Sequence, residues 1–83
     1  MKIYVLSFLD LQHYGFGTKD VYVSRDRKEL ERRMRYDFIQ KAKEELGITE
    51  EEAIAGYNDV QFSEGSYAYI NNFYYWDIFE KEV

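Results

Sequence analysis

Few side chains in this sequence have the types and spacing that catalysis requires. The single histidine, His13, falls in a stretch expected to be a loop, and the absence of cysteine removes thiolate chemistry. Sixteen acidic residues offer many carboxylate pairs for acid–base work, but no spacing distinguishes one pair. The G-x-S-x-G context of a serine nucleophile is absent around Ser7, Ser24, Ser63 and Ser66. We therefore expect a protein that is not an enzyme.

Phosphate-binding and metal-binding motifs are equally poorly represented. Residues 15–19 contain two glycines and a lysine, but they lie between two expected strands, whereas a phosphate-binding loop precedes a helix. Asp10 and His13 could share an ion, but two ligands do not make a metal site. We expect no cofactor and no metal.

Acidic side chains form the first candidate binding site. Residues 1–43 contain ten Lys/Arg and six Asp/Glu, which gives a net charge of +4. Residues 44–83 contain one Lys and ten Asp/Glu, which gives a net charge of −9. One interpretation is a solvated helix surface, because acids in the first turn of a helix are stabilised by its dipole. The other is a negative patch that docks on a basic groove of a nucleic-acid-handling protein. The candidate residues are Glu44, Glu45, Glu50, Glu51 and Glu52.

Basic side chains are concentrated at the start of the expected main helix. They could contact phosphates. However, Glu29–Arg33 and Glu31–Arg35 are i,i+4 pairs, which favours a solvated helix face. Because the chain is also acidic overall, with a net charge of −5, we do not expect direct nucleic-acid binding. The residues concerned are Arg25, Arg27, Lys28, Arg32, Arg33 and Arg35.

Aromatic side chains form the second candidate binding site. They make up 19% of the chain, and many alternate along two expected strands near the C-terminal end. One amphipathic helix covers only one face of a sheet, so the other face would expose Tyr and Trp, which are frequent binding hot spots. The alternative is an ordinary core on both faces of the sheet. The candidates expected opposite the main helix are Tyr67, Tyr69, Tyr74 and Trp76.

The elements that position these residues begin with two strands. Residues 2–9 are rich in β-branched and aromatic side chains, and both alternating sets are apolar, which predicts a strand covered on both faces. Residues 20–24 predict a second strand, antiparallel to the first. A helix is expected from a cap at Asp26, with Glu29 completing a capping box, and Ser24 is a rival cap. This helix is expected to run to about residue 46, with Gly47 as the glycine that follows its end. Its apolar stripe recurs every four residues at Leu30, Met34, Phe38, Ala42 and Leu46.

The second half predicts a short helix and three strands. Thr49 and Glu52 form a capping box that opens a helix to residue 55. Residues 59–63 and 66–70 predict a hairpin, and residues 73–79 predict a final strand after the Asn71–Asn72 turn. The order β-β-α-α-β-β-β predicts one α+β domain over residues 1–83. Its antiparallel sheet of four to five strands would carry one main helix on one face.

The cellular location of the protein is predicted from its short apolar segments and from the absence of cysteine. Residues 1–9 are too short for a signal peptide, because Asp10, Gln12 and His13 follow at once. No stretch approaches the length of a membrane span. The absence of cysteine fits a reducing compartment. We expect a cytoplasmic protein without membrane contact.

The chain resembles a group of small phage and bacterial proteins. The resemblance is carried by Lys2-Ile-Tyr-Val-Leu-Ser, by the Ser-Arg-Asp-Arg-Lys-Glu start of the helix at residues 24–29, and by Phe73-Tyr-Tyr-Trp-Asp-Ile-Phe-Glu80. It implies an accessory protein of a mobile element or host genome and transfers no functional residues. In size and acidity the chain is similar to anti-CRISPR and other anti-defence inhibitors.

These patterns together predict an acidic interaction protein. We expect it to bind, and to inhibit, a protein partner such as a nucleic-acid-handling or defence protein. Two alternatives remain open. One is a protein that sequesters a nucleotide-like ligand between aromatic rings. The other is a homodimeric structural module, in which a second copy covers the spare face of the sheet.

Overall fold

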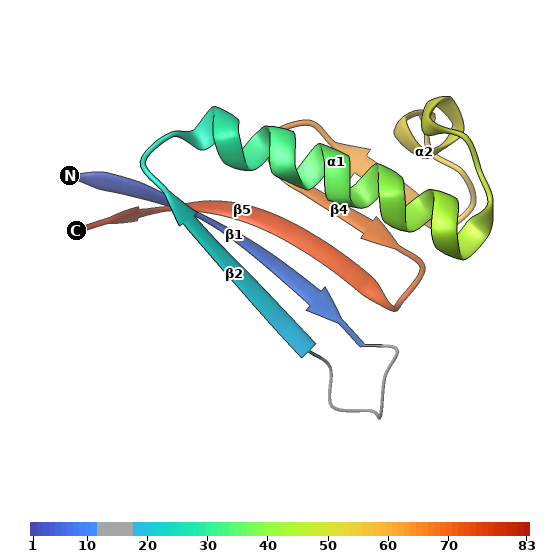
Figure 1. Cartoon of the computed structure of the whole chain (residues 1–83), viewed down its shortest axis with the longest axis horizontal. Helices are drawn as coiled ribbons and strands as arrows, with labels where there is room; N and C mark the ends of the chain where they lie inside the picture. Colours follow the sequence, from blue (N-terminus) through green and yellow to red (C-terminus); the bar gives the residue numbers. More distant parts are fainter. Residues whose placement is uncertain (12–17) are drawn as a thin grey trace.

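The computed structural model describes residues 1–11 and 18–83, and the side chains of residues 18 and 19 are not described (Figure 1). The chain is an α+β fold with five antiparallel strands, one long helix and one short helix, in the predicted order β-β-α-α-β-β-β. The elements are β1 (Lys2–Asp10), β2 (Thr18–Ser24), α1 (Arg27–Leu46), α2 (Glu50–Ala55), β3 (Val60–Ser63), β4 (Tyr67–Ile70) and β5 (Tyr74–Glu82).

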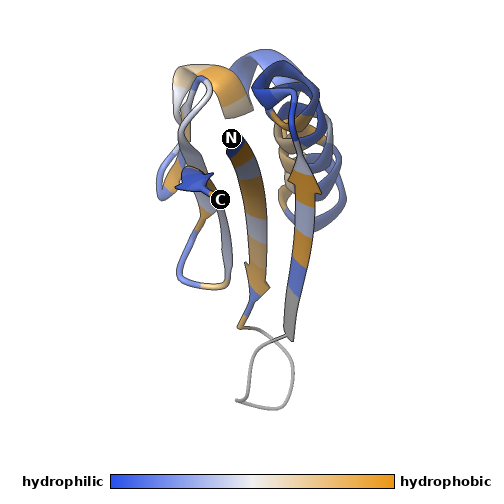
Figure 2. Cartoon of the chain, turned by 90° about the vertical axis from the view of Figure 1, so that its left-hand side faces the viewer, coloured by the Kyte–Doolittle hydropathy of each residue, from blue (hydrophilic) through white to orange (hydrophobic). Residues whose placement is uncertain are grey.

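The strands form one sheet in the order β2-β1-β5-β4-β3. The first and last strands of the sequence therefore pair at its centre, with Leu6 opposite Ile78. The helix α1 crosses one face and passes in front of β4 in Figure 1. Figure 2 shows α1 end-on beside the strands, so the molecule has a sheet layer and a helical layer.

The α1 helix forms where local signals predict it. The Asp26 side chain accepts a hydrogen bond from the Lys28 amide, at 3.0 Å. The predicted capping box is wrong in one detail, because Glu29 accepts a hydrogen bond from the Ser24 hydroxyl, at 3.4 Å. Gly47 ends the helix in the left-handed conformation, at φ +65°, and its N–H donates to the Lys43 carbonyl.

The apolar stripe of α1 lies on the sheet. Four of its predicted members are fully buried, whereas the fifth, Leu46, is exposed because the stripe slants across the helix. Ring packing fixes the centre of the core. The Phe38 ring meets Trp76 edge-on at 5.7 Å and lies 5.2 Å from Phe62, and the Phe8 ring lies 4.8 Å from Trp76.

The α2 helix extends the helical layer toward β3. Thr49 and Glu52 form the predicted capping box, in which each side chain accepts a hydrogen bond from the amide of the other residue, at 3.1 and 3.0 Å. Ile48 and Ala53 are buried in the same cluster as the α1 stripe. Both helices therefore cover the same face of the sheet.

The two ends of the chain lie side by side at one end of the β1–β5 pair (Figure 1). The Met1 amino group donates to the Val83 carbonyl at 3.0 Å, and the Val83 amide donates to the Met1 carbonyl at 2.8 Å. The β5 strand runs to Glu82, three residues beyond the predicted end, because this pairing continues along β1.

Candidate functional site

The face of the sheet away from α1 has no helix over it in the part of the chain that the structure describes. We call this surface the open face. Cross-strand partners share a face, so the register assigns its members directly. Its apolar side chains are those of Ile3, Val5, Leu9, Val21, Val23, Tyr67, Tyr69, Tyr75 and Phe79.

A row of three apolar side chains crosses one end of the open face. Val5 in β1 pairs with Val23 in β2 on one side and with Phe79 in β5 on the other. Val23 and Phe79 are 59% and 44% exposed, whereas Val5 between them is 7% exposed. The flanking side chains thus shield Val5, although no second layer within residues 1–11 and 18–83 covers it, and they present a continuous apolar strip to solvent.

An aromatic row crosses the other end of the open face. Tyr69 in β4 pairs with Tyr75 in β5, and their ring centroids are 6.3 Å apart. Gln61 in β3 holds two tyrosine hydroxyls, because its amide nitrogen donates to Tyr67 at 3.0 Å and its oxygen accepts from Tyr69 at 2.9 Å. Gln61 therefore restricts the motion of the Tyr67 and Tyr69 rings on this surface.

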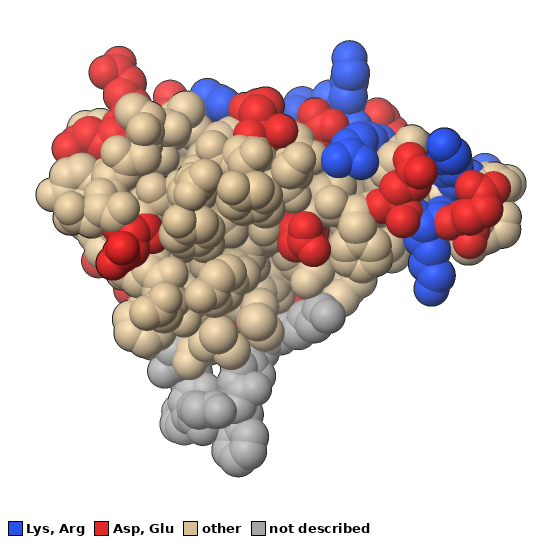
Figure 3. Space-filling model, turned by 180° about the vertical axis from the view of Figure 1, so that it is seen from behind, with Lys and Arg blue, Asp and Glu red and all other residues tan. Residues whose placement is uncertain are grey.

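Charge is sparse on the open face. Asp77 lies in its central row, opposite Ser7 on one side and Tyr67 on the other, and Lys81 lies opposite Ile3. Seen from behind, the molecule shows a broad uncharged area with isolated acidic side chains (Figure 3). Basic and acidic side chains are mixed along its border and toward the end that holds the termini. A largely apolar surface with a charged border is the usual anatomy of a protein-binding surface, and Asp77 departs from this pattern at the centre.

Two of the four aromatic candidates are not on the open face. Tyr74 and Trp76 are each 2% exposed and lie under α1, so their predicted placement opposite the helix is wrong. The reason is the register, which pairs Tyr69 with Tyr75 and Ala68 with Trp76. Tyr75 and Phe79 take their places on the open face beside Tyr67 and Tyr69.

The acidic candidates all lie on the helices and not on the open face. Glu50, Glu51 and Glu52 occupy the first turn of α2, and Glu52 is held in the capping box. Glu44 and Glu45 lie in the last turn of α1, where the Glu45 carboxylate hydrogen-bonds to the Tyr74 hydroxyl. Burial, with Glu45 and Asp10 nearby, raises the pKa of Tyr74 to about 12.

Three of the basic residues of α1 form ion pairs, but not in the predicted combinations. Arg27 bridges to Glu31 at 3.2 Å, and Arg35 bridges to Glu64 at 3.3 Å. Arg33 contacts Asp37 at 3.8 Å and stacks on the Tyr22 ring, 3.6 Å from its centroid. The candidate ligand His13 and most of the glycine-rich stretch lie outside the described residues.

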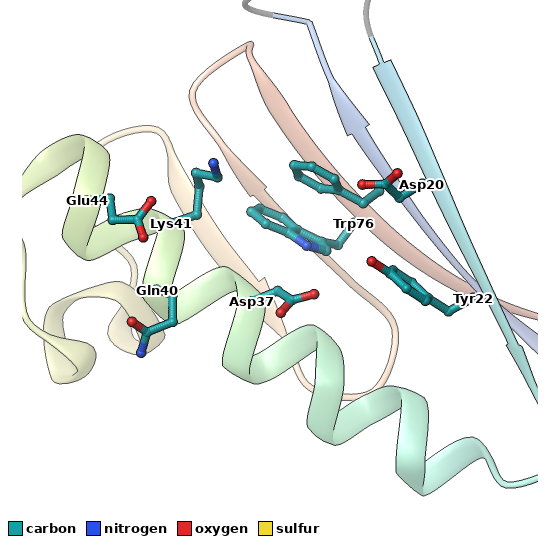
Figure 4. Close-up of a pocket in the computed structure, with 8 residues that line it drawn as sticks. Asp20, Tyr22, Asp37, Gln40, Lys41, Glu44 and Trp76 are labelled. Atoms are coloured by element: carbon teal, nitrogen blue, oxygen red, sulfur yellow. The ribbon is translucent and has the colours of Figure 1, made fainter.

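A cleft that was not predicted opens between α1 and the β1–β2 side of the sheet. It has a volume of about 220 Å³ and is separated from the open face by the sheet itself. Strand residues Phe8, Asp20, Tyr22 and Trp76 face helix residues across it (Figure 4). The helix residues are Asp37, Gln40, Lys41 and Glu44.

Two polar groups in the cleft, the Asp37 carboxylate and the Trp76 indole N–H, lack interactions strong enough to offset their burial. Burial raises the pKa of Asp37, nearby Arg33 lowers it, and Asp20 raises it, with a net upward direction. The indole N–H of Trp76 is buried and has no hydrogen-bond partner among the described residues. Asp20 and Asp37 come from elements distant in the sequence, so no local motif could have indicated this cleft.

Comparisons with known proteins found no matching family model, no similar curated protein and no similar solved structure. No helix in the described part of the chain is long and apolar enough to cross a membrane.

Proposed function

We propose that this chain is a non-catalytic interaction module whose open face binds another protein. The observation that supports this most directly is the solvent exposure of large apolar side chains from β2, β4 and β5 on one continuous surface. Monomeric proteins seldom leave such a patch uncovered, and patches of this kind mark interaction sites. The chemistry of the face also fits a binding hot spot, since tyrosine dominates its aromatic row.

The charge of the molecule favours a partner other than nucleic acid or a second copy. The open face offers Lys81 as a described basic side chain at its end and Asp77 at its centre, which is unsuited to a phosphate backbone. Each copy carries a net charge of −5, which opposes self-association. The occupant that fits best is a different protein with an apolar surface and basic groups that reach the acidic side chains around the face.

The test introduces a charge at two separate positions of the open face, one on β5 and one on β2. Tyr75→Lys and Val21→Lys should each weaken capture of the partner by about 2 kcal/mol or more, because a buried unpaired lysine is costly at an interface. Partners are captured on immobilised wild-type chain, identified, and then titrated against each variant. Circular dichroism checks that each variant keeps its fold.

Tyr36→Lys is the matched control, because Tyr36 is 66% exposed on the outer surface of α1. A partner retained by this control and lost by both face variants would support the proposal. A partner that binds all variants equally would contradict it. Light scattering on the purified chain gives a further outcome: a dimer that Tyr75→Lys dissociates would assign the face to a second copy instead.

A further inference from the structure

The cleft under α1 has features of a ligand site that the open face does not use. It lies on the opposite side of the sheet, so a ligand there would not compete with a protein on the open face. Its walls combine the aromatic rings of Phe8 and Tyr22 with the carboxylates of Asp20 and Asp37. Carboxylates beside aromatic rings are surroundings that proteins use for organic cations, and the Arg33 guanidinium already stacks on the Tyr22 ring in this way.

The negative charge in the cleft is only partly neutralised. Arg33 lies 3.8 Å from the Asp37 carboxylate, a long separation for an ion pair, and its guanidinium is already stacked on Tyr22. The Lys41 ammonium lies over the Tyr74 ring, 5.0 Å from its centroid, and points away from Asp37 in Figure 4. The Asp20 side chain is exposed at the mouth of the cleft, and its carboxylate is close enough to raise the pKa of Asp37.

The second, independent feature is the orphaned donor of Trp76. The residue is 2% exposed, and its indole N–H has no partner among the described residues. In Figure 4 the indole nitrogen is on the edge of the ring that faces Asp37 and Tyr22. A buried donor without an acceptor is destabilising, so an oxygen atom delivered to this edge would be stabilised.

We propose that this cleft binds a small primary ammonium ligand that carries an oxygen acceptor on the carbon next to the aminomethyl group. The ammonium group lies between the carboxylates of Asp20 and Asp37. The oxygen, a carbonyl or a hydroxyl, accepts a hydrogen bond from the indole N–H of Trp76 after a small opening of the cleft. Amino-acid amides and amino alcohols have this chemistry.

Four probes separate the two contacts, and calorimetry measures each of them. Glycinamide and ethanolamine carry both the ammonium and the oxygen, propylammonium lacks the oxygen, and propionamide lacks the charge. We expect at least one of the first two to bind with a millimolar or lower Kd, propylammonium to bind at least about fivefold more weakly, and propionamide not to bind. The better of the first two identifies the oxygen as carbonyl or hydroxyl. Equal binding of propionamide, or no binding by any probe, would overturn the proposal.

Charge-removing variants locate the ammonium contact. Asp37→Asn and Asp20→Asn should each weaken the better probe about tenfold, because a charge-assisted hydrogen bond is lost. Asp77→Asn removes the same charge from the open face and should leave the affinity unchanged. If Asp77→Asn weakens binding as much as Asp37→Asn, the attraction is only the overall charge and the assigned site is wrong.

The oxygen contact has its own readout, because Trp76 is the single tryptophan of the chain. Its indole N–H resonance should move downfield when the better probe binds and should respond much less to propylammonium. Trp76→Phe should remove the preference for that probe over propylammonium. An indole resonance that does not move at saturation would overturn this contact even if Trp76→Phe fails to fold.

Discussion

Tyr69 and Tyr75 lie directly opposite each other on neighbouring strands, with their ring centroids 6.3 Å apart and their planes inclined by 36°. Gln61 fixes the Tyr69 hydroxyl from β3, so three strands contribute to one aromatic row on an uncovered surface. This row gives the open face both a defined shape and hydrogen-bonding groups at its edge.

The first prediction concerns the energy of that pair. A double-mutant cycle with Tyr69→Ala and Tyr75→Ala should give a coupling free energy of about 0.2–1 kcal/mol in urea unfolding, as for other cross-strand aromatic pairs. The control cycle combines Tyr69→Ala with Phe79→Ala, since these residues lie in different rows of the same face. The control changes should be additive, and equal coupling in both cycles would contradict the register.

The second prediction concerns the core. Phe38→Ala should lower the free energy of unfolding by about 3–5 kcal/mol, because the ring is fully buried between Phe62 and Trp76. Tyr36→Ala, on the exposed side of the same helix, should change it by about 0.5 kcal/mol or less. Similar losses in the two variants would mean that α1 presents a different side to the sheet.

The third prediction concerns the start of α2. Thr49→Ala should cost about 0.5–2 kcal/mol in chemical unfolding, because the Glu52 amide loses its acceptor. Thr49→Ser keeps the hydroxyl and should recover most of the loss. An alanine variant as stable as the wild type would indicate that the capping box does not stabilise the short helix.

The fourth prediction is a dependence of stability on high pH. Burial and the neighbouring carboxylates raise the pKa of Tyr74 to about 12 in the folded chain, above its ordinary value of 10.0. The unfolded chain therefore loses this proton first, so the contribution to stability is complete below pH 10 and is lost as the pH rises toward 12.

Tyr74→Phe isolates this effect, since it removes the ionising group and keeps the ring. The fall in unfolding free energy between pH 10 and 12 should be shallower in this variant than in the wild type. Tyr36→Phe controls for the loss of one tyrosine from the exposed surface of α1. If Tyr74→Phe and wild type have parallel pH profiles, the raised pKa is absent.

The sequence predicts the elements well because their signals are local. The caps at Asp26 and Thr49, the glycine at 47 and the four-residue stripe of α1 each depend on neighbours along the chain. The final strand also shows its two alternating sets, with Tyr74 and Trp76 in one set and Tyr75 in the other. Aromatic content does not separate the two sets. The signal that does is Asp77, which belongs to the Tyr75 set and indicates that this set faces away from the helix.

The cleft was beyond prediction for a different reason. Asp20 and Asp37 are unremarkable in the sequence, and they line one cleft only because α1 packs across the β1–β2 side of the sheet (Figure 1). The orphaned Trp76 donor likewise follows from how α1 and β5 pack. Such features require the crossing geometry of elements that are distant in the chain.

Met1 and Val83 are hydrogen-bonded to each other, so the first and last residues of this backbone lie side by side. A short linker between these residues, with a new break in the exposed turn at Asn72, would give a permuted chain whose strands could form the same sheet. Labels fused to either end would leave from the same corner of the molecule. They could therefore anchor it to a surface from one point, with the aromatic row and the cleft at a distance from the attachment.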